Sequence, residues 1–267
     1  MTDRPGADYS SLMSERAQTT VESTKRGRVT VITLRREAKR NAIDASITEG
    51  IDNALNEFED DPEQWCAVLT GGDRFFSAGA DLAAGPGEPT PRGGIAGIIT
   101  RERGKPLIAA VEGFALGGGL ELVLCCDLVV AATDARFGLP EPKRGLMPDF
   151  GGAFRITRAL PPNVARELLL TGDDIDAARA ERLGFVNRLT EPGAALAGAL
   201  ELAERICTNA PLAVRGALRI ADTAVAGDES ALWELSHATH AELLRSADLR
   251  EGLTAFFEKR TPRWSGK

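Results

Sequence analysis

The stretch Val111–Val130, VEGFALGGGLELVLCCDLVV, is the most informative part of this chain. Its residues are nearly all small or apolar, and three consecutive glycines precede a single carboxylate, Glu121, that stands between leucines. An ionised side chain in apolar surroundings costs free energy unless it is paired or used. The pattern predicts a buried strand that runs into a glycine turn, followed by a helix that carries Glu121.

The bulk composition is that of a soluble globular protein. The chain has 267 residues, of which 43% are hydrophobic and 27% charged, and its formal net charge is −7. This length is sufficient for one large domain with a full core, or for two small ones. The acidic balance argues against a general nucleic-acid binder, because such a protein needs a basic face.

Cysteine usage, the N-terminal sequence and the apolar runs favour a cytoplasmic protein that does not span a membrane. None of the four cysteines forms a C-x-x-C pair, which argues against a zinc site, and apolar surroundings indicate reduced thiols. Residues 1–24 are polar, lack the apolar core of a signal peptide, and are expected to form a flexible tail. The longest apolar run is interrupted by Gly, Glu and Asp, so no membrane span is expected.

The first part of the chain alternates between strand and helix patterns. Asp44 is placed to cap a helix that ends near Glu59. Strands alternating with helices predict an α/β core with right-handed crossovers, here over residues 25–190. Short β-branched or buried apolar runs predict strands at Arg28–Arg36, Cys66–Gly72, Pro106–Gly113 and Asp127–Ala132.

From Asp149 onward helical patterns dominate, apart from a strand at Phe185–Thr190. Residues 191–267 are therefore expected to form a helical C-terminal region. The Gly- and Pro-rich segment Ala83–Gly94 is longer than a connector needs and is expected to border a ligand. The helical patterns cover Asn163–Leu170, Asp176–Leu183, Ala194–Thr208, Leu212–Val225, Ser230–Arg245 and Leu249–Lys259.

Several common kinds of site are missing from the sequence. It contains no P-loop, no complete G-x-G-x-x-G after a strand, and no G-x-S-x-G nucleophile elbow. His237 and His240 have the spacing of half a metal site, but no ligand pattern accompanies them, so no metal is expected. With only these two histidines, acid–base chemistry must depend on carboxylates, lysine or tyrosine.

The glycine turn before Glu121 is suited to hold a developing negative charge. A helix N-terminus exposes unpaired N–H groups, and glycine lets a ligand approach them closely. Glu121 lies one helical turn after Gly118, close to whatever those groups hold. A second small-residue turn, GGDRFFSAGADL at residues 71–82, offers the N–H of Ala80, and Glu141 follows between two prolines. The alternative is close glycine packing with Glu121 in an ion pair.

Four stretches together resemble the crotonase superfamily, and most closely its enoyl-CoA hydratases. They occur in the family's order, and the match extends from Arg28 to Trp264. The resemblance implies an α/β fold with a ββα spiral core and a helical C-terminal trimerisation region, assembled as a homotrimer or a dimer of trimers. The stretches are FFSAGADL, AAVEGFALGGGLEL, CDLVVAATDARFGLPE and REGLTAFFEKRTPRW.

The resemblance also implies an acyl-CoA thioester as substrate and assigns the main catalytic roles. By motif position, the N–H groups of Ala80 and Gly118 form the oxyanion hole. Glu121 matches the carboxylate that activates water, and Glu141 the one that exchanges the proton at the α-carbon. No metal or redox cofactor is implied, because the thioester itself activates the double bond.

Substrate-binding residues follow from the same matches. The segment RREAKRNAI at residues 35–43 matches the loop beside the adenine, which implies contacts from Ala38 and Arg40. Ala78, Asp81 and Leu82 border the acyl-CoA site by position. Phe256 and Lys259 match tail residues that reach the ligand, usually that of a neighbouring subunit, although Lys259 also fits an exposed lysine at a helix end.

Asp149 departs from the pattern of simple hydratases, which often carry a small residue there. Some isomerases of the family use an aspartate at this position for proton transfer. The favoured interpretation is a helix N-cap, because Asp149 precedes Phe150-Gly151-Gly152.

The sequence therefore predicts hydration of a trans-2-enoyl-CoA to a (3S)-3-hydroxyacyl-CoA, in the degradation of fatty or related acyl chains by β-oxidation. One alternative is an enoyl-CoA or dienoyl-CoA isomerase that uses Asp149 or Glu141. Another is a non-catalytic acyl-CoA-binding protein.

Overall fold

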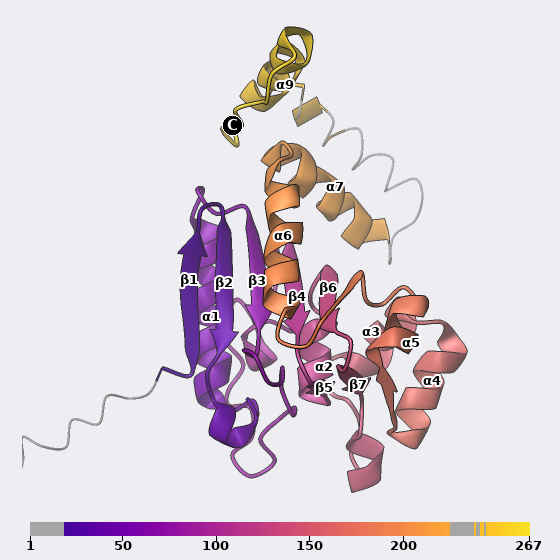
Figure 1. Cartoon of the computed structure of the whole chain (residues 1–267). Coiled ribbons are helices and arrows are strands. Elements are labelled where there is room, and N and C mark those ends of the chain that lie inside the picture. Colours follow the sequence, from indigo (N-terminus) through magenta and orange to yellow (C-terminus); the bar gives the residue numbers. More distant parts are fainter. Residues whose placement is uncertain (1–18, 225–237, 239–240, 243) are drawn as a thin grey trace, which may run out of the picture.

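The computed structural model describes residues 19–224, 238, 241–242 and 244–267, and it shows a layered α/β body with a helical C-terminal part (Figure 1). The expected helix at Ser230–Arg245 and the histidines His237 and His240 fall largely or wholly outside these residues. No helix in the described ranges is long and apolar enough to cross a membrane.

A six-stranded sheet forms the centre of the body, in the order β1-β2-β3-β4-β6-β9. Strands β1 and β2 are antiparallel, and every later neighbour is parallel, as the crossover pattern predicts. Strands β2, β3 and β4 are buried along their whole length, which explains their continuous apolar sequences. The strands are β1 (Val21–Arg26), β2 (Val29–Leu34), β3 (Cys66–Thr70), β4 (Leu107–Val111), β6 (Leu128–Ala132) and β9 (Arg188–Thr190).

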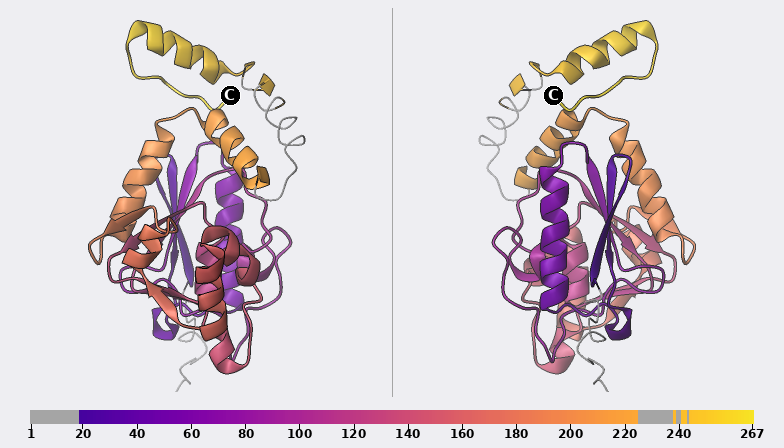
Figure 2. Two further views of the ribbon diagram at one scale, coloured as in Figure 1. Left: turned by 90° about the vertical axis from the view of Figure 1, so that its right-hand side faces the viewer. Right: turned by 90° about the vertical axis from the view of Figure 1, so that its left-hand side faces the viewer.

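Two helices cover opposite faces of this sheet, as Figure 2 shows with the sheet nearly edge-on. Helix α1 (Ala45–Asp60) begins at Asp44, whose carboxylate accepts a hydrogen bond from the Ile47 N–H at 3.1 Å. It buries Ile47, Ile51, Leu55 and Phe58 in the larger hydrophobic core. On the other face α6 (Ala195–Cys207) places three alanines against β2, β3, β4 and β6.

A second, three-stranded sheet lies beside the first and positions the residues of the expected site. It contains β5 (Phe114–Leu116), β7 (Arg136–Gly138) and β8 (Asp174–Asp176), in that order. Strand β5 leads directly into α2 (Gly118–Val123), and β7 leads into the short 3₁₀ helix η4 (Glu141–Arg144). The parallel pairing of β5 with β7 brings these two exits to the same edge of the sheet.

The remaining helices surround this body. Helices α3 (Gly152–Ala159), α4 (Pro162–Thr171) and α5 (Ala177–Arg182) lie beside the smaller sheet, whereas α7 (Pro211–Ala224) and α9 (Ala247–Glu258) form the C-terminal part (Figure 1). Two further 3₁₀ turns are η2 (Glu37–Lys39) and η3 (Ile95–Gly97). Because α6 packs against the sheet, the helical segment after residue 190 begins within the core. The domain boundary itself stays a prediction.

The N-terminal expectation needs one correction. Residues 21–24, which were assigned to a flexible tail, belong to β1 and pair with β2 from Val21↔Leu34 to Arg26↔Val29. This strand was overlooked because only Val21 is buried and the other five residues are exposed. Its polar sequence therefore has the composition of a tail, although its backbone completes the edge of the sheet.

Candidate active site

The expected catalytic residues line one cavity of about 310 Å³. We call it the carboxylate cavity, because Glu121, Glu141 and Asp149 all contribute to its wall. It is formed by the turn before α2, the start of α2, the segment around η4, and the loop after β3. Its other lining residues are Arg40, Ala78, Gly79, Ala80, Leu82, Phe114, Leu116, Gly117, Gly118, Pro140, Arg144, Leu146, Met147 and Phe150.

The amides of Ala80 and Gly118 lie side by side in this cavity. A Cβ atom added to Gly118 would stand 3.2 Å from the Ala80 nitrogen, and one added to Gly79 would stand 3.0 Å from the Gly118 nitrogen. Within the described part of the chain, neither amide donates a hydrogen bond. The turn requires glycine, because Gly79 and Gly117 have φ angles of 99° and 55°. Two adjacent unused N–H groups are suited to bind one oxygen that gains negative charge.

Glu121 is a buried carboxylate in the first turn of α2, with an exposed fraction of 2%. Its Oε1 accepts a hydrogen bond of 2.7 Å from the Gly152 N–H, at the first residue of α3. Burial raises the pKa of Glu121 to about 7, the Gly152 hydrogen bond acts in the lowering direction, and the charge of Glu141 raises the pKa further. A carboxyl group with a pKa near neutrality can both take and give a proton. The alternative of an ion-paired Glu121 is wrong, since the salt bridges of the described residues do not include it.

Glu141 begins η4 and faces the turn that carries Gly118. A Cβ atom on Gly117 would lie 2.9 Å from its Oε1. Its Oε2 atom is buried and has no hydrogen-bond partner among the described residues. Burial raises the pKa of Glu141, and the charge of Asp149 raises it further. Among the described residues neither Glu121 nor Glu141 forms an ion pair, although the charge of Arg144 acts to lower the pKa of Glu141. The negative charge of Glu141 disfavours ionisation of Glu121, which favours a state in which the two groups share one proton.

Asp149 does not cap a helix, so the favoured expectation for this residue is wrong. Helix α3 begins at Gly152 with Gly151 in the N-cap position, and no side-chain hydrogen bond caps it there. Gly151 adopts a φ of 89°, and the amide at the helix start is taken by Glu121 from another segment. The exposed Asp149 carboxylate lines the cavity, and it forms no hydrogen bond or ion pair within the described residues.

Several residues expected to bind the substrate border the same cavity. Arg40, in the left-handed conformation after η2, accepts a hydrogen bond of 3.0 Å at its carbonyl from the Ala78 N–H, which joins two parts of the rim. Leu82 also lines the cavity and is 71% exposed. Ala38 is exposed on η2 but does not reach the wall.

Asp81 does not line the carboxylate cavity and is instead paired with Arg36. Its carboxylate forms an ion pair of 2.9 Å with Arg36 and accepts hydrogen bonds from the N–H groups of Ala83 and Ala84. It thereby shapes the loop that carries Leu82, and a direct contact with the substrate stays a prediction.

The tail residues do not join the cavity within one chain. Lys259 is exposed after α9, and α9 lies at the opposite end of the molecule from α2 (Figure 1). The side chain of Phe256 is outside the described residues. Their predicted contact with a ligand therefore requires a neighbouring copy of the chain.

Sequence reasoning missed part of the wall. Arg144, Leu146 and Met147 follow Glu141 in the same segment, and Phe114 and Phe150 flank the two glycine turns. Proximity in sequence to Glu141 was an available signal for Arg144. No metal-binding group of three His, Cys, Asp or Glu side chains occurs within the described ranges.

Comparisons with known proteins identify a family and a fold. The model of the family described as enoyl-CoA hydratase/isomerase matches residues 24–267. A carnitinyl-CoA dehydratase of Citrobacter koseri is 42% identical over 255 residues, which cover 91% of this chain and 97% of that protein. An enoyl-CoA hydratase structure from Mycobacterium tuberculosis H37Rv, also 42% identical, has a TM-score of 0.90 and covers 94% of this chain and 100% of its own. A carnitinyl-CoA hydratase structure from Mycobacterium avium, 42% identical with the same coverage, has a TM-score of 0.75. The expected fold class is confirmed.

Proposed function

The chain belongs to the enoyl-CoA hydratase/isomerase family, and we propose that it catalyses the reversible addition of water to a 2-enoyl-CoA thioester, forming a (3S)-3-hydroxyacyl-CoA. The observation that carries this proposal is the convergence of Glu121, Glu141 and the unused amides of Ala80 and Gly118 on one cavity. Two carboxyl groups of raised pKa and two N–H donors supply the acid, the base and the oxyanion site that this reaction needs.

In this proposal the thioester oxygen accepts hydrogen bonds from the N–H groups of Ala80 and Gly118. Ionised Glu121 takes a proton from water while the water oxygen bonds to the β-carbon. The electron pair of the double bond moves toward the thioester, and protonated Glu141 gives its proton to the α-carbon. One water is consumed, and afterwards Glu121 carries a proton from that water, whereas Glu141 has given its own proton to the α-carbon. Exchange of protons with solvent restores the starting state.

The rim of the cavity suits the phosphates of coenzyme A. Arg40 and Arg144 line it, and neither forms an ion pair within the described residues. A guanidinium group can hold a phosphate through two parallel hydrogen bonds. Lys259 and Phe256 would complete this contact from a neighbouring copy, in the homotrimer or dimer of trimers that the family resemblance implies.

The experiment that tests hydration is a panel of 2-enoyl-CoA and 3-enoyl-CoA thioesters, followed by the absorbance of the conjugated thioester. Hydration of a 2-enoyl-CoA removes the absorbance, whereas isomerisation of a 3-enoyl-CoA creates it without consuming water. Turnover of 3-enoyl-CoA substrates alone would reject the proposed hydratase activity and favour an isomerase. Tight acyl-CoA binding without turnover of any substrate would favour the non-catalytic binding protein.

The unpaired carboxylate of Asp149 favours a second candidate, in which the acyl group itself carries a positive charge. A third negative charge beside Glu121 and Glu141 opposes their ionisation, and a cationic substrate would compensate it. Phe114 and Phe150 in the same wall could contact a quaternary ammonium group. Relatives named carnitinyl-CoA dehydratase, at 41–42% identity, are consistent with such a substrate.

A pair of matched substrates tests this candidate. One is the butenoyl thioester with a trimethylammonium group on its terminal carbon, and the other carries a neutral tert-butyl group of the same shape. We expect a higher kcat/KM for the cationic substrate and a loss of that preference, by about tenfold, in Asp149→Asn. Equal rates on both substrates in the parent enzyme would reject the candidate. Loss of all turnover in Asp149→Asn would instead assign proton transfer to Asp149.

A further inference from the structure

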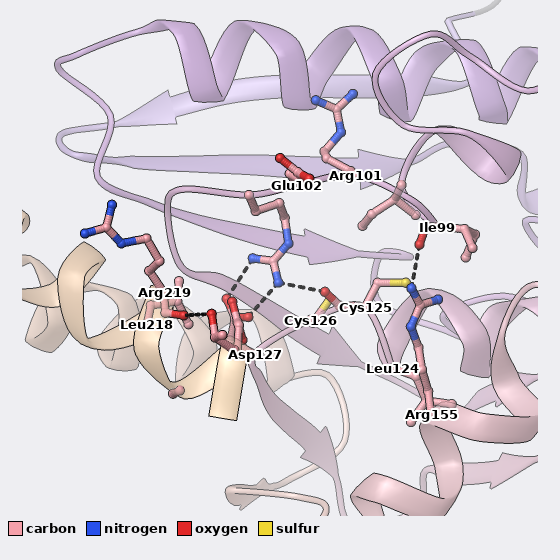
Figure 3. A pocket seen from close by; sticks show the side chains of 15 residues that line it. Ile99, Arg101, Glu102, Leu124, Cys125, Cys126, Asp127, Arg155, Leu218 and Arg219 are labelled. Atoms are coloured by element: carbon pink, nitrogen blue, oxygen red, sulfur yellow. Dashed lines mark hydrogen bonds and ion pairs between the residues drawn. The ribbon is translucent and has the colours of Figure 1, made fainter. Parts of the chain in front are cut away.

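A second cavity, of about 890 Å³, lies at the other end of α2 (Figure 3). We call it the arginine cavity, because Arg101, Arg103, Arg155 and Arg219 contribute to its wall. Leu124, Cys125 and Cys126, which directly follow α2, also line it. Thus the first turn of α2 faces the carboxylate cavity, while the residues after its end face the arginine cavity.

Arg155 differs from its neighbours in what its guanidinium contacts. Arg101 and Arg103 form ion pairs with Asp52 and Asp127. The hydrogen bonds of Arg155 go to two backbone carbonyls: Nη1–H donates to Phe150 O at 3.1 Å, and Nη2–H donates to Ile99 O at 2.5 Å. Figure 3 shows the contact with Ile99. A carboxylate partner for Arg155 is not found among the described residues.

The carbonyl of Phe150 belongs to the turn that presents the Gly152 N–H to Glu121. Only Gly151 lies between them, and its φ of 89° makes the turn strongly bent. A Cβ atom on Gly151 would lie 2.8 Å from Nη1 of Arg155, so the guanidinium rests directly on the bend. The Phe150 ring on the other side is 5% exposed and stands 3.2 Å from the position of a Cβ on Gly118.

A small set of the described residues acts on Glu121. They are Glu141 from η4, Asp149 and the Phe150–Gly152 turn before α3, and Cys125 on the following helical turn, whose Sγ–H donates to the Glu121 carbonyl at 3.3 Å. Of these, the turn supplies the hydrogen bond that stabilises the ionised form of Glu121. The geometry of the turn therefore controls how readily the carboxyl group gives up its proton.

We propose that Arg155 is a positioning residue for the proposed hydration reaction: by joining the carbonyls of Phe150 and Ile99 with its planar fork, it fixes the turn that presents the Gly152 N–H to Glu121. The claim rests on the proposed function. It assigns a role to the fork geometry of arginine, because a single ammonium group cannot reach both carbonyls with the same rigidity.

The test compares the pH profile of kcat/KM for 2-enoyl-CoA hydration in the parent enzyme, Arg155→Met and Arg155→Lys. We expect Arg155→Met to lower kcat/KM by about tenfold to 100-fold, since small displacements of a reacting group have effects of this size. The acid limb, which follows ionisation of Glu121, should move to higher pH because the turn no longer holds its N–H in place. Arg155→Lys keeps the charge and should recover only part of both effects.

Arg158→Met is the matched control, because Arg158 lies on the same helix, is exposed, and contacts the same Phe154 ring as Arg155. It should leave the rate and the pH profile unchanged. An unmoved acid limb in Arg155→Met would overturn the proposal, and so would an Arg155→Lys enzyme that matches the parent. Thermal unfolding shows whether Arg155→Met is folded. If it is not, the rate and pH profile of Arg155→Lys decide whether the proposal holds.

Carbon-13 NMR of the glutamate carboxyl groups follows the titration of Glu121 without substrate. A parent enzyme without hydration activity would reject the proposed function. Arg155→Met with an upward-shifted Glu121 titration would still support the positioning role. An unshifted titration would reject it.

Discussion

The two cavities at the ends of α2 differ in how their charged side chains are paired. In the arginine cavity Arg103 and Asp127 form a largely buried ion pair at 2.6 Å, and Arg101 pairs with Asp52. In the carboxylate cavity neither Glu121 nor Glu141 forms an ion pair with any of the described residues. Paired charges hold segments together, whereas unpaired carboxyl groups retain raised pKa values and remain able to exchange protons.

The difference shows how one short helix can serve two purposes. Its far end is fixed by Arg103, which also donates to the Cys125 carbonyl at 2.9 Å, so the position of α2 is set by ordinary structural contacts. The first turn of α2 can then carry Glu121 in buried surroundings that disfavour its ionised form. The following predictions test whether the two ends are separable in this way.

The largest effect should come from removing a proton-transfer group in the carboxylate cavity. Glu121→Gln and Glu141→Gln should each lower kcat for hydration by about 1000-fold or more, because general acid–base catalysis contributes on this scale. Steady-state rates on a 2-enoyl-CoA measure the loss. Glu49→Gln, at an exposed position on α1, should retain full activity. A mild effect of Glu121→Gln would mean that this end of α2 is structural too.

Breaking the ion pair at the other end should affect stability and not chemistry. Arg103→Met leaves Asp127 without its partner and should lower the free energy of unfolding by about 3 kcal/mol. Urea denaturation measures that loss, and active-site titration gives the rate per folded molecule, which should stay near the parent value. A large fall in the rate per folded molecule would show that the two ends of α2 are coupled.

Gly117→Ala tests the carboxylate cavity more finely, because it adds one methyl group beside the carboxyl group of Glu141. The new methyl group would meet Glu141 Oε1 at 2.9 Å in a residue with φ of 55°. We expect kcat to fall by about tenfold to 100-fold through displacement of Glu141.

The matched control is Gly184→Ala, which has a φ of 81° and open space around the added methyl group. It should cost similar stability, about 1 kcal/mol, without loss of kcat. Equal kcat values for Gly117→Ala and Gly184→Ala, measured at saturating substrate, would contradict the placement of Glu141.

The smallest effect concerns how the free energy of unfolding depends on pH. The pKa of Glu121 is raised above its ordinary value of 4.5 to about 7, so the folded state binds its proton more tightly than the unfolded state. This contribution to stability is fully present below pH 4.5 and is lost as pH rises to about 7. Glu121→Gln should lack this decline, as urea denaturation at several pH values will show. A parallel decline in both proteins would assign the pH dependence to other groups.

Much of this arrangement could be predicted from sequence, where the signal was local. Neighbouring residues are sufficient to predict the apolar strands β3, β4 and β6, the helix cap at Asp44 and the order of the glycine turns. The predicted set of Ala80, Gly118, Glu121 and Glu141 occupies one cavity. Their catalytic roles stay predictions.

What could not be predicted depends on contacts between distant segments. The start of α3 was misassigned because its amide is bound by a carboxylate 31 residues earlier in the chain, and no local pattern announces that contact. Arg155 was overlooked for the same reason, since its partner Ile99 is 56 residues away. β1 escaped notice because its stability comes from pairing with β2 and not from its own polar residues.

In the proposed reaction, the hydrogen bond between Glu121 and Gly152 couples the beginning of α3 to the catalytic cycle. When Glu121 takes a proton from water in that reaction, it becomes a weaker acceptor for the Gly152 N–H, and it recovers when the proton departs. The amide resonance of Gly152 should therefore act as an internal indicator of turnover, changing its chemical shift with the protonation of an atom that belongs to another helix.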